Sequence, residues 1–214
     1  MTLHHHPSDE IMLDYAAGNL GEAAGLAVAS HISLCQRCRK ASRILDGIGG
    51  RFLAQEQGVP ADGAEFDGVL SRAMRLPPVG LPPAWPGSVL PRPLREHLGF
   101  DREGVPWRRL GMGAFQHVIP TRDRRTTARL LRIPAGRPVP VHTHGGVELT
   151  LVLSGAFSDD TGFYARGDLQ EADATIEHQP KAAPGQDCIC LAVTDAPLRF
   201  KSWAARLVQP FLNI

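Results

Sequence analysis

The spacing of hydrophobic residues divides the chain into a helical first part and a β-rich second part. Up to about residue 76, apolar residues recur at helical intervals, which predicts four helices, within residues 8–18, 22–35, 38–56 and 66–76. Ser8 is a candidate N-cap of the first helix, and Gly18 is a candidate C-terminal stop. The glycines between positions 47 and 50 are expected to interrupt the third helix, because glycine is a poor helix former.

After residue 100 the pattern changes to short apolar runs that Gly, Pro or Asp separates. Runs of this length and spacing are typical of strands joined by turns, so we expect an antiparallel β-barrel or sandwich. The expected strands lie within residues 113–120, 126–134, 147–157, 168–173 and 187–197. The apolar C-terminal stretch, residues 197–214, is expected to add strands or a docking segment.

A stretch dense in proline, residues 77–95, separates the two parts. Proline removes a helical hydrogen bond and favours extended chain, so we expect a stiff connector here. The prediction is therefore an α + β protein of several domains, with a small helical bundle over residues 1–76 and an antiparallel β-barrel over residues 96–214. We expect two independent hydrophobic cores, one on each side of the connector.

The composition adds three negative expectations. Hydrophobic residues make up 43% and charged residues 21% of the 214-residue chain, which is typical of a soluble globular protein. The net charge is +1 and no basic run stands out, which argues against direct binding to nucleic acid. No apolar stretch reaches the roughly 18 residues of a membrane span, and the first residues lack a secretory signal pattern. We therefore expect no membrane contact and a cytoplasmic protein.

His31, Cys35 and Cys38 form the motif His-x3-Cys-x2-Cys in the helical part. Residues four apart share a helix face, so His31 and Cys35 are expected to point the same way, with Cys38 at the next turn. One imidazole and two thiolates suit tetrahedral zinc, and the histidines at positions 4–6 offer a fourth ligand. Spacing does not choose among those three. Such a site would stabilise a domain too small to rely on its core alone.

Other interpretations of these residues stay open. A Cys-x2-Cys pair also occurs as a redox dithiol, although that motif usually accompanies a βαβ unit, which the pattern does not show. In a reducing compartment a close cysteine pair favours metal or redox chemistry over a structural disulfide. The histidines at 4–6 are also compatible with a tag remnant or an ordinary surface segment.

A second cluster lies in the β-rich part, where His142, His144 and Glu148 stand beside a strongly apolar run. Alternate residues of a strand share a face, so the two histidines converge, and a turn at residues 145–146, both glycine, can return Glu148 to the same point. His178 is a candidate fourth ligand. Three imidazoles and a carboxylate in a small barrel suit Zn, Fe, Mn or Ni. The alternative is a loop in which Glu148 pairs with an arginine.

Cys188 and Cys190 form a second close pair, within a run of strand character. Both side chains are expected on one face of that strand. They are either small buried core residues or thiols that an oxidant attacks, and the sequence does not decide between the two roles.

The second cluster resembles the first motif of the cupin family, whose offsets are kept by Gly136, His142, His144, Glu148 and Gly155. This resemblance implies a cupin-type barrel that binds a metal, with His178 as the fourth ligand.

The second cupin motif is kept only in part. Gly167 and His178 have the expected offset, whereas Asp173, Thr175 and Ala182 replace the usual proline, glycine and asparagine. These departures leave the metal histidine in place but argue against ordinary cupin enzyme activity.

The chain as a whole resembles the ChrR-type zinc-binding anti-sigma factors. The resemblance rests on YAAGNL and HISLCQRC in the helical part and on VHTHGGVELTLVLSGAF, DCICLAVTDAPLRF and RLVQPF in the β-rich part. In that family a helical zinc domain holds an extracytoplasmic-function sigma factor of the group that responds to singlet oxygen and organic hydroperoxides. A C-terminal cupin-like domain is the sensing part.

This resemblance implies a transcriptional regulator with a sigma factor as its partner and no catalytic residue. It assigns zinc to His6, His31, Cys35 and Cys38, and so chooses His6 among the N-terminal histidines. A change at the metal or the thiols of the barrel is expected to alter the relation of the two domains through the stiff connector and release the partner, and oxidation, metal loss and proteolysis all stay open as the release mechanism. The alternative is a cupin metalloenzyme, a dioxygenase or isomerase with an attached zinc module, although no base separate from the metal ligands is evident.

Overall fold

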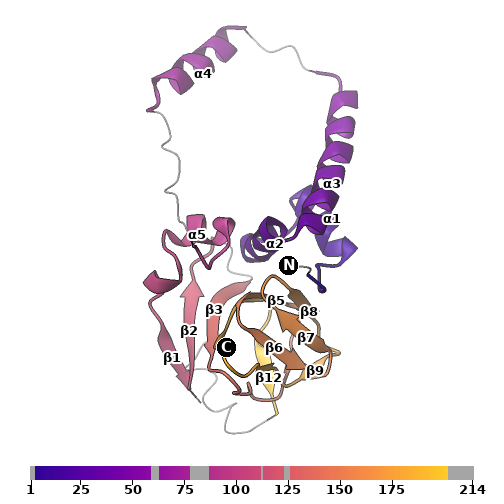
Figure 1. The fold of residues 1–214 in the computed structure, drawn as a ribbon. Coiled ribbons are helices and arrows are strands. Elements are labelled where there is room, and N and C mark those ends of the chain that lie inside the picture. Colours follow the sequence, from indigo (N-terminus) through magenta and orange to yellow (C-terminus); the bar gives the residue numbers. More distant parts are fainter. Residues whose placement is uncertain (1–2, 59–62, 78–86, 112, 123–125, 202–214) are drawn as a thin grey trace.

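The computed structural model describes residues 3–58, 63–77, 87–111, 113–122 and 126–201 (Figure 1). Its helical part contains α1 (Asp9–Ala17), α2 (Glu22–Leu34), α3 (Gln36–Gln55) and α4 (Gly63–Arg75). The expected caps of α1 are confirmed: the Ser8 side chain accepts a hydrogen bond from the Ile11 amide, and Gly18 adopts the left-handed conformation, with φ of 74°. Among the described helices, none combines the length and the apolar character needed to cross a membrane.

Two expectations about helices are wrong. The third helix is not interrupted, because α3 continues through residues 47–50. Each glycine costs a helix only about 1 kcal/mol, and good helix formers stand on both sides of this stretch. A helix, α5 (Arg92–Leu98), also begins within the proline-rich connector; it has proline in its first turn and ends at Gly99. Proline is tolerated there because the first amides of a helix need no partner within it. Residues 78–86 of the connector lie outside the described residues.

Within the described residues, the β-rich part forms three antiparallel sheets that surround one interior. The strand orders are β1-β2-β3-β11-β5-β8, β10-β6-β7 and β12-β4-β9, and all pairs are antiparallel. A short 3₁₀ helix, residues 102–104, precedes them. The strands are β1 (Arg108–Gly111), β2 (Ala114–Ile119), β3 (Thr127–Ile133), β4 (His142–His144), β5 (Glu148–Ser154), β6 (Ala156–Asp159), β7 (Gly162–Ala165), β8 (Leu169–Ala172), β9 (Glu177–His178), β10 (Lys181–Ala182), β11 (Cys188–Thr194) and β12 (Leu198–Phe200).

The expected barrel is confirmed, and each expected run contains at least one of these strands. The C-terminal stretch contributes β12, whereas residues 202–214 lie outside the described part. All seven residues of β5 are buried because the strand is covered on both faces. Its Glu148 and Thr150 face the barrel interior, and the alternating Leu149, Leu151 and Leu153 belong to the core on the outer face.

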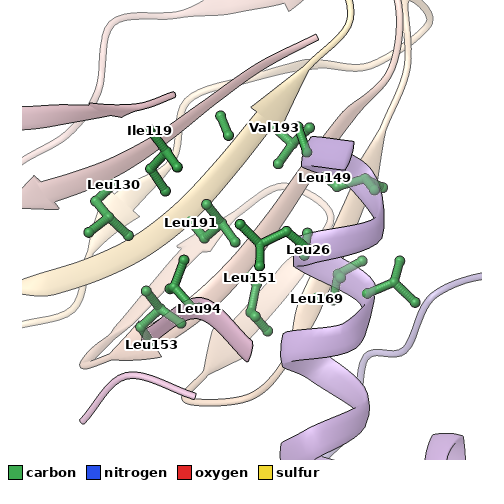
Figure 2. Packing of buried hydrophobic residues seen from close by; sticks show 14 of the residues in the cluster. Leu26, Leu94, Ile119, Leu130, Leu149, Leu151, Leu153, Leu169, Leu191 and Val193 are labelled. Atoms are coloured by element: carbon green, nitrogen blue, oxygen red, sulfur yellow. The ribbon is translucent and has the colours of Figure 1, made fainter. Parts of the chain in front are cut away.

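The two parts of the protein share one hydrophobic core, so the expectation of two independent cores is wrong. Helix α2 lies across the outer face of the six-stranded sheet, where Leu26 packs among leucines of β5, β8 and β11 (Figure 2). Helix α2 packs on the barrel because its composition leaves it no fully polar face. Its buried residues are Ala23, Leu26, Ala27, Val28, Ser30 and His31. A helix of this kind needs cover on several sides, and α1 and α3 supply only part of it.

Two candidate metal centres

The first cluster is assembled from three separate pieces of chain. His31 lies near the end of α2, Cys35 stands between α2 and α3, Cys38 lies in the first turn of α3, and His6 belongs to the extended segment before α1. The His6 Nδ1 atom lies 3.4 Å from the Sγ atoms of both cysteines, and His31 Nε2 lies 3.3 Å from Cys38 Sγ. A tetrahedral zinc ion separates such ligand atoms by about 3.5 Å, so the spacing fits zinc.

The helix junction, rather than one continuous helix face, presents the two cysteines. Cys35 is the N-cap of α3, and its Sγ accepts a hydrogen bond from the Cys38 amide at 3.4 Å. The expectation that His31 and Cys35 share a helix is therefore wrong in detail, although the two side chains do meet.

A hydrogen bond to the barrel orients His31. The Gly167 carbonyl can only accept, so His31 Nδ1 donates to it, over 2.8 Å, and leaves Nε2 free to bind a metal. Burial lowers the pKa of His31 to about 4, so the ring is neutral at physiological pH. Burial, followed by the neighbouring Cys35, raises the pKa of the Cys38 thiol to about 12. A cation bound in the cluster would stabilise the Cys38 thiolate and so lower this pKa.

The second cluster lies inside the barrel. His142 and His144 are on β4, Glu148 begins β5, and His178 ends β9, so the sheet β12-β4-β9 and the six-stranded sheet together supply the cluster. The Nε2 atom of His178 lies 3.1 Å from Nε2 of both His142 and His144. These spacings suit nitrogen ligands of one ion, which lie about 3.3 Å apart around tetrahedral zinc.

Two hydrogen bonds to neighbouring oxygens fix the rings of this cluster. His142 Nδ1 donates to the Pro140 carbonyl over 2.9 Å, and His178 Nδ1 donates to Asp159 Oδ2 over 2.7 Å. Each bond leaves the Nε2 lone pair directed into the cluster, as in metal sites whose histidines are held by a second oxygen. Burial lowers the pKa of His142, which keeps its ring neutral and able to bind a metal.

Unpaired buried atoms show that the second cluster suits a cation. Among the described residues, His144 Nδ1 and Glu148 Oε2 are buried without a hydrogen-bond partner, although they lie 3.1 Å apart. Burial by itself would raise the pKa of Glu148, but the surrounding imidazoles, His144 foremost, hold it below its usual value. A buried, ionised carboxylate among three imidazoles is the donor set that a divalent transition metal fits.

A small cavity of about 70 Å³ opens beside this cluster, and Cys188 and Cys190 lie in its wall. Both cysteines are buried on the same face of β11, as expected. A hydrogen bond between them, together with burial, raises the pKa of the Cys190 thiol well above its usual range.

Sequence reasoning missed the residues that orient the ligands, namely Asp159 and the carbonyls of Pro140 and Gly167. Asp159 ends β6 in a stretch of two aspartates, a threonine and a glycine, which indicates only a turn. A main-chain carbonyl leaves no signal in the sequence at all.

Comparison with known proteins identifies both halves. Residues 95–197 match the family described as the ChrR cupin-like domain, which confirms the cupin type of the barrel. The chain is 45% identical to the anti-sigma-E factor ChrR of Cereibacter sphaeroides over the full length of both proteins. It also resembles the crystal structure of Rhodobacter sphaeroides SigE in complex with the anti-sigma ChrR, with a TM-score of 0.79 and 42% identity over 90% of this chain and 99% of that chain.

These relatives are regulators, which favours the prediction of a regulator over that of a cupin metalloenzyme. Since the identity runs through the helical half as well as the barrel, the chain belongs to the ChrR family of anti-sigma factors.

Proposed function

We propose that this protein binds and inhibits an extracytoplasmic-function sigma factor through its third and fourth helices. The observation that carries the proposal is a pair of apolar stripes on α3 and α4. Ile44, Ile48 and Phe52 follow one another at four-residue intervals on α3, with exposures of 65%, 47% and 65%. Residues four apart share a helix face, so each stripe is continuous.

The stripe on α4 has the same spacing. It consists of Phe66, Leu70 and Met74, flanked by Val69, and α4 buries no side chain within the described part of the protein. Exposed apolar rows of this size mark interaction surfaces, and amphipathic helices of this kind bind in the grooves of a partner. Figure 1 shows α3 extending away from the barrel and α4 standing apart from it, so both stripes are open to a large partner.

The related complex supports a sigma factor as that partner, because it contains SigE and the anti-sigma ChrR. Inhibition would follow if the helices cover the surface with which the sigma factor binds RNA polymerase. We expect the purified protein to prevent its sigma factor from joining core RNA polymerase, as measured by co-elution of the two. Formation of a ternary complex that still transcribes would contradict the proposal.

In this proposal the first cluster, His6, His31, Cys35 and Cys38, holds structural zinc. When bound, zinc supplies binding energy that fixes the segment before α1 to the junction of α2 and α3. The helical domain, residues 1–76, then presents α3 at a fixed angle to the partner.

Zinc binding at this cluster should strengthen as pH rises. Cys38 must lose its proton to bind zinc, and burial raises the pKa of its thiol to about 12 in the metal-free cluster. His31 adds no pH dependence near neutrality because its pKa is about 4. We therefore expect the zinc Kd to fall at least about tenfold per unit of pH between pH 6 and 8, as measured by competition with a chelator. A Kd that does not change with pH would show that no thiol proton is displaced.

The barrel, residues 96–214, serves as the sensing domain and holds Zn, Fe, Mn or Ni through His142, His144, Glu148 and His178. Residues 77–95 connect it to the helical domain. A bound metal would supply a Lewis-acidic centre at the wall of the pocket. The chain's own residues direct three imidazoles and one carboxylate at that centre.

The signal in this proposal is an oxidant, singlet oxygen or an organic hydroperoxide, and Cys188 and Cys190 are its candidate targets beside the zinc-held thiolates. Both cysteines lie in the pocket wall, which would give a small oxidant access to them. Since the pKa of Cys190 is raised, this residue carries little thiolate at rest and would react slowly with weak oxidants. A cysteine of this kind would react only when the oxidant accumulates in the pocket.

A further inference from the structure

The segment before α1, residues 3–8, is bound to the barrel along its length. Asp168, which is buried, accepts hydrogen bonds from the amides of His4 and His5 at 2.8 and 3.0 Å. The Leu169 amide donates to the His5 carbonyl at 3.2 Å, and Ser8 donates to Glu171 from its amide and its hydroxyl. This segment, which includes the cluster residue His6, therefore has its position set by β8 and the turn before it.

A chain of hydrogen bonds runs outward from the barrel cluster to the same region. His178 donates to Asp159, whose side chain is fully buried, and Asp159 Oδ1 accepts from Thr161 Oγ1 at 2.6 Å. The Thr161 hydroxyl has one proton, which it donates to the Asp159 carboxylate. In its 2.9 Å contact with the Tyr164 hydroxyl it therefore accepts, and Tyr164 donates. Gln170 donates to both Asp159 and Thr161 and completes their hydrogen bonding.

This chain of hydrogen bonds ends at Tyr164, whose ring contacts His5, the residue next to His6. The rings of Tyr164 and His5 lie 4.2 Å apart, and His5 also lies over Gly162, so its ring is seated on the hairpin of β6 and β7. His31, the other histidine of the first cluster, donates to Gly167, the neighbour of Asp168. Both imidazoles of the first cluster are thus positioned by one stretch of the barrel, residues 164–169.

We infer that the two metal centres are energetically coupled through Asp159, Thr161, Tyr164 and His5. The inference rests on the metal sites proposed above and adds a route by which the barrel's state reaches the helical domain. A metal on His178 fixes its ring and polarises its donation to Asp159, which holds the hairpin under His5. Loss of that metal frees the His178 ring, loosens the hairpin and weakens the hold on His6. Asp159 and Tyr164 are positioning residues in this route.

Coupling between two sites is reciprocal, so each metal strengthens the binding of the other by the same factor. We expect the barrel metal to tighten metal binding at the first cluster about tenfold, within the usual range for coupled sites.

The test uses the full-length chain with cobalt as the probe. Cobalt bound by thiolates absorbs through sulfur-to-metal charge transfer, so this band reports the first cluster, since the four candidate ligands in the barrel include no cysteine. Cobalt affinity is measured in the wild type and in His142→Ala, in which the barrel site is disabled. Metal analysis gives the number of ions per chain in each protein.

We expect the first cluster to bind cobalt about tenfold more weakly in His142→Ala than in the wild type. In the background of Tyr164→Phe, which removes only the donating hydroxyl, His142→Ala should change the affinity less than about twofold. In the background of His5→Ala, which leaves the barrel interior intact, His142→Ala should likewise change the affinity less than about twofold. Tyr15→Phe is the matched control, because it makes the same change outside the route, and it should keep the tenfold effect.

Three results would overturn the inference, and they are distinguishable. In the first result, the wild type binds two ions and His142→Ala binds one, but the first cluster has the same cobalt affinity in both. This result would rule out the coupling and leave both metal sites in place. A wild type that binds one ion would remove the barrel site and the coupling together. If Tyr15→Phe abolished the effect and Tyr164→Phe did not, the proposed route would be wrong.

Discussion

Replacing Cys38 with alanine should empty the first cluster of zinc and release the helices that it joins. Structural zinc contributes about 10–16 kcal/mol in small zinc domains, so its loss exceeds what the remaining contacts supply. The structure describes all of α3, and Cys38 is its single buried residue. We expect one zinc fewer per chain, a partial loss of helical signal by circular dichroism, and loss of sigma-factor binding. Helix α2 should persist, because the barrel covers it.

Cys190→Ala is the matched control for this variant. It removes the same side chain from a buried position outside the first cluster. It should keep zinc in the helical domain, the helical signal and sigma-factor binding. A Cys38→Ala protein that still held one tight zinc in that domain would refute the ligand assignment.

Replacing Phe52 with glutamate should abolish tight binding of the sigma factor without affecting the metal. Phe52 is 65% exposed and is the aromatic member of the apolar stripe on α3. A key aromatic residue contributes about 2 kcal/mol or more to an interface, and the variant would also bury an unpaired charge against apolar groups. We expect the Kd for the sigma factor to rise at least about 30-fold, as measured by calorimetry or anisotropy.

Phe163→Glu is the control for this second variant. Phe163 is similarly exposed, at 57%, but it lies on β7 of the barrel, away from the helical stripes. The same change there should leave the Kd within about twofold of the wild type, as is usual for surface substitutions. If the two variants weakened binding equally, the stripe on α3 would not be the contact surface.

The parts of the structure that local chemistry determines were predictable from the sequence. The caps of α1 depend on Ser8 and Gly18, whose side chain and backbone preference act within one turn. The strands follow from alternation and turn residues. His142 and His144 converge because alternate residues of one strand share a face, a rule that needs no knowledge of the rest of the fold.

The parts that depend on distant contacts were not predictable. The sequence shows α2 to be apolar, yet it does not show that Leu26 packs on β5 rather than within a helical bundle. Asp159 reaches His178 only because the hairpin of β6 and β7 folds over β9. The anchoring of His31 by the Gly167 carbonyl depends on the same docking of the two halves.

The most direct test of the central claim is the association state of the zinc-loaded chain mixed with its extracytoplasmic-function sigma factor. Size-exclusion chromatography with light scattering would measure the mass of the complex. We predict a single species that contains one copy of each protein, and its loss when a chelator removes zinc. If the folded, zinc-loaded chain and the sigma factor elute separately at micromolar concentration, the protein is not an anti-sigma factor for that partner.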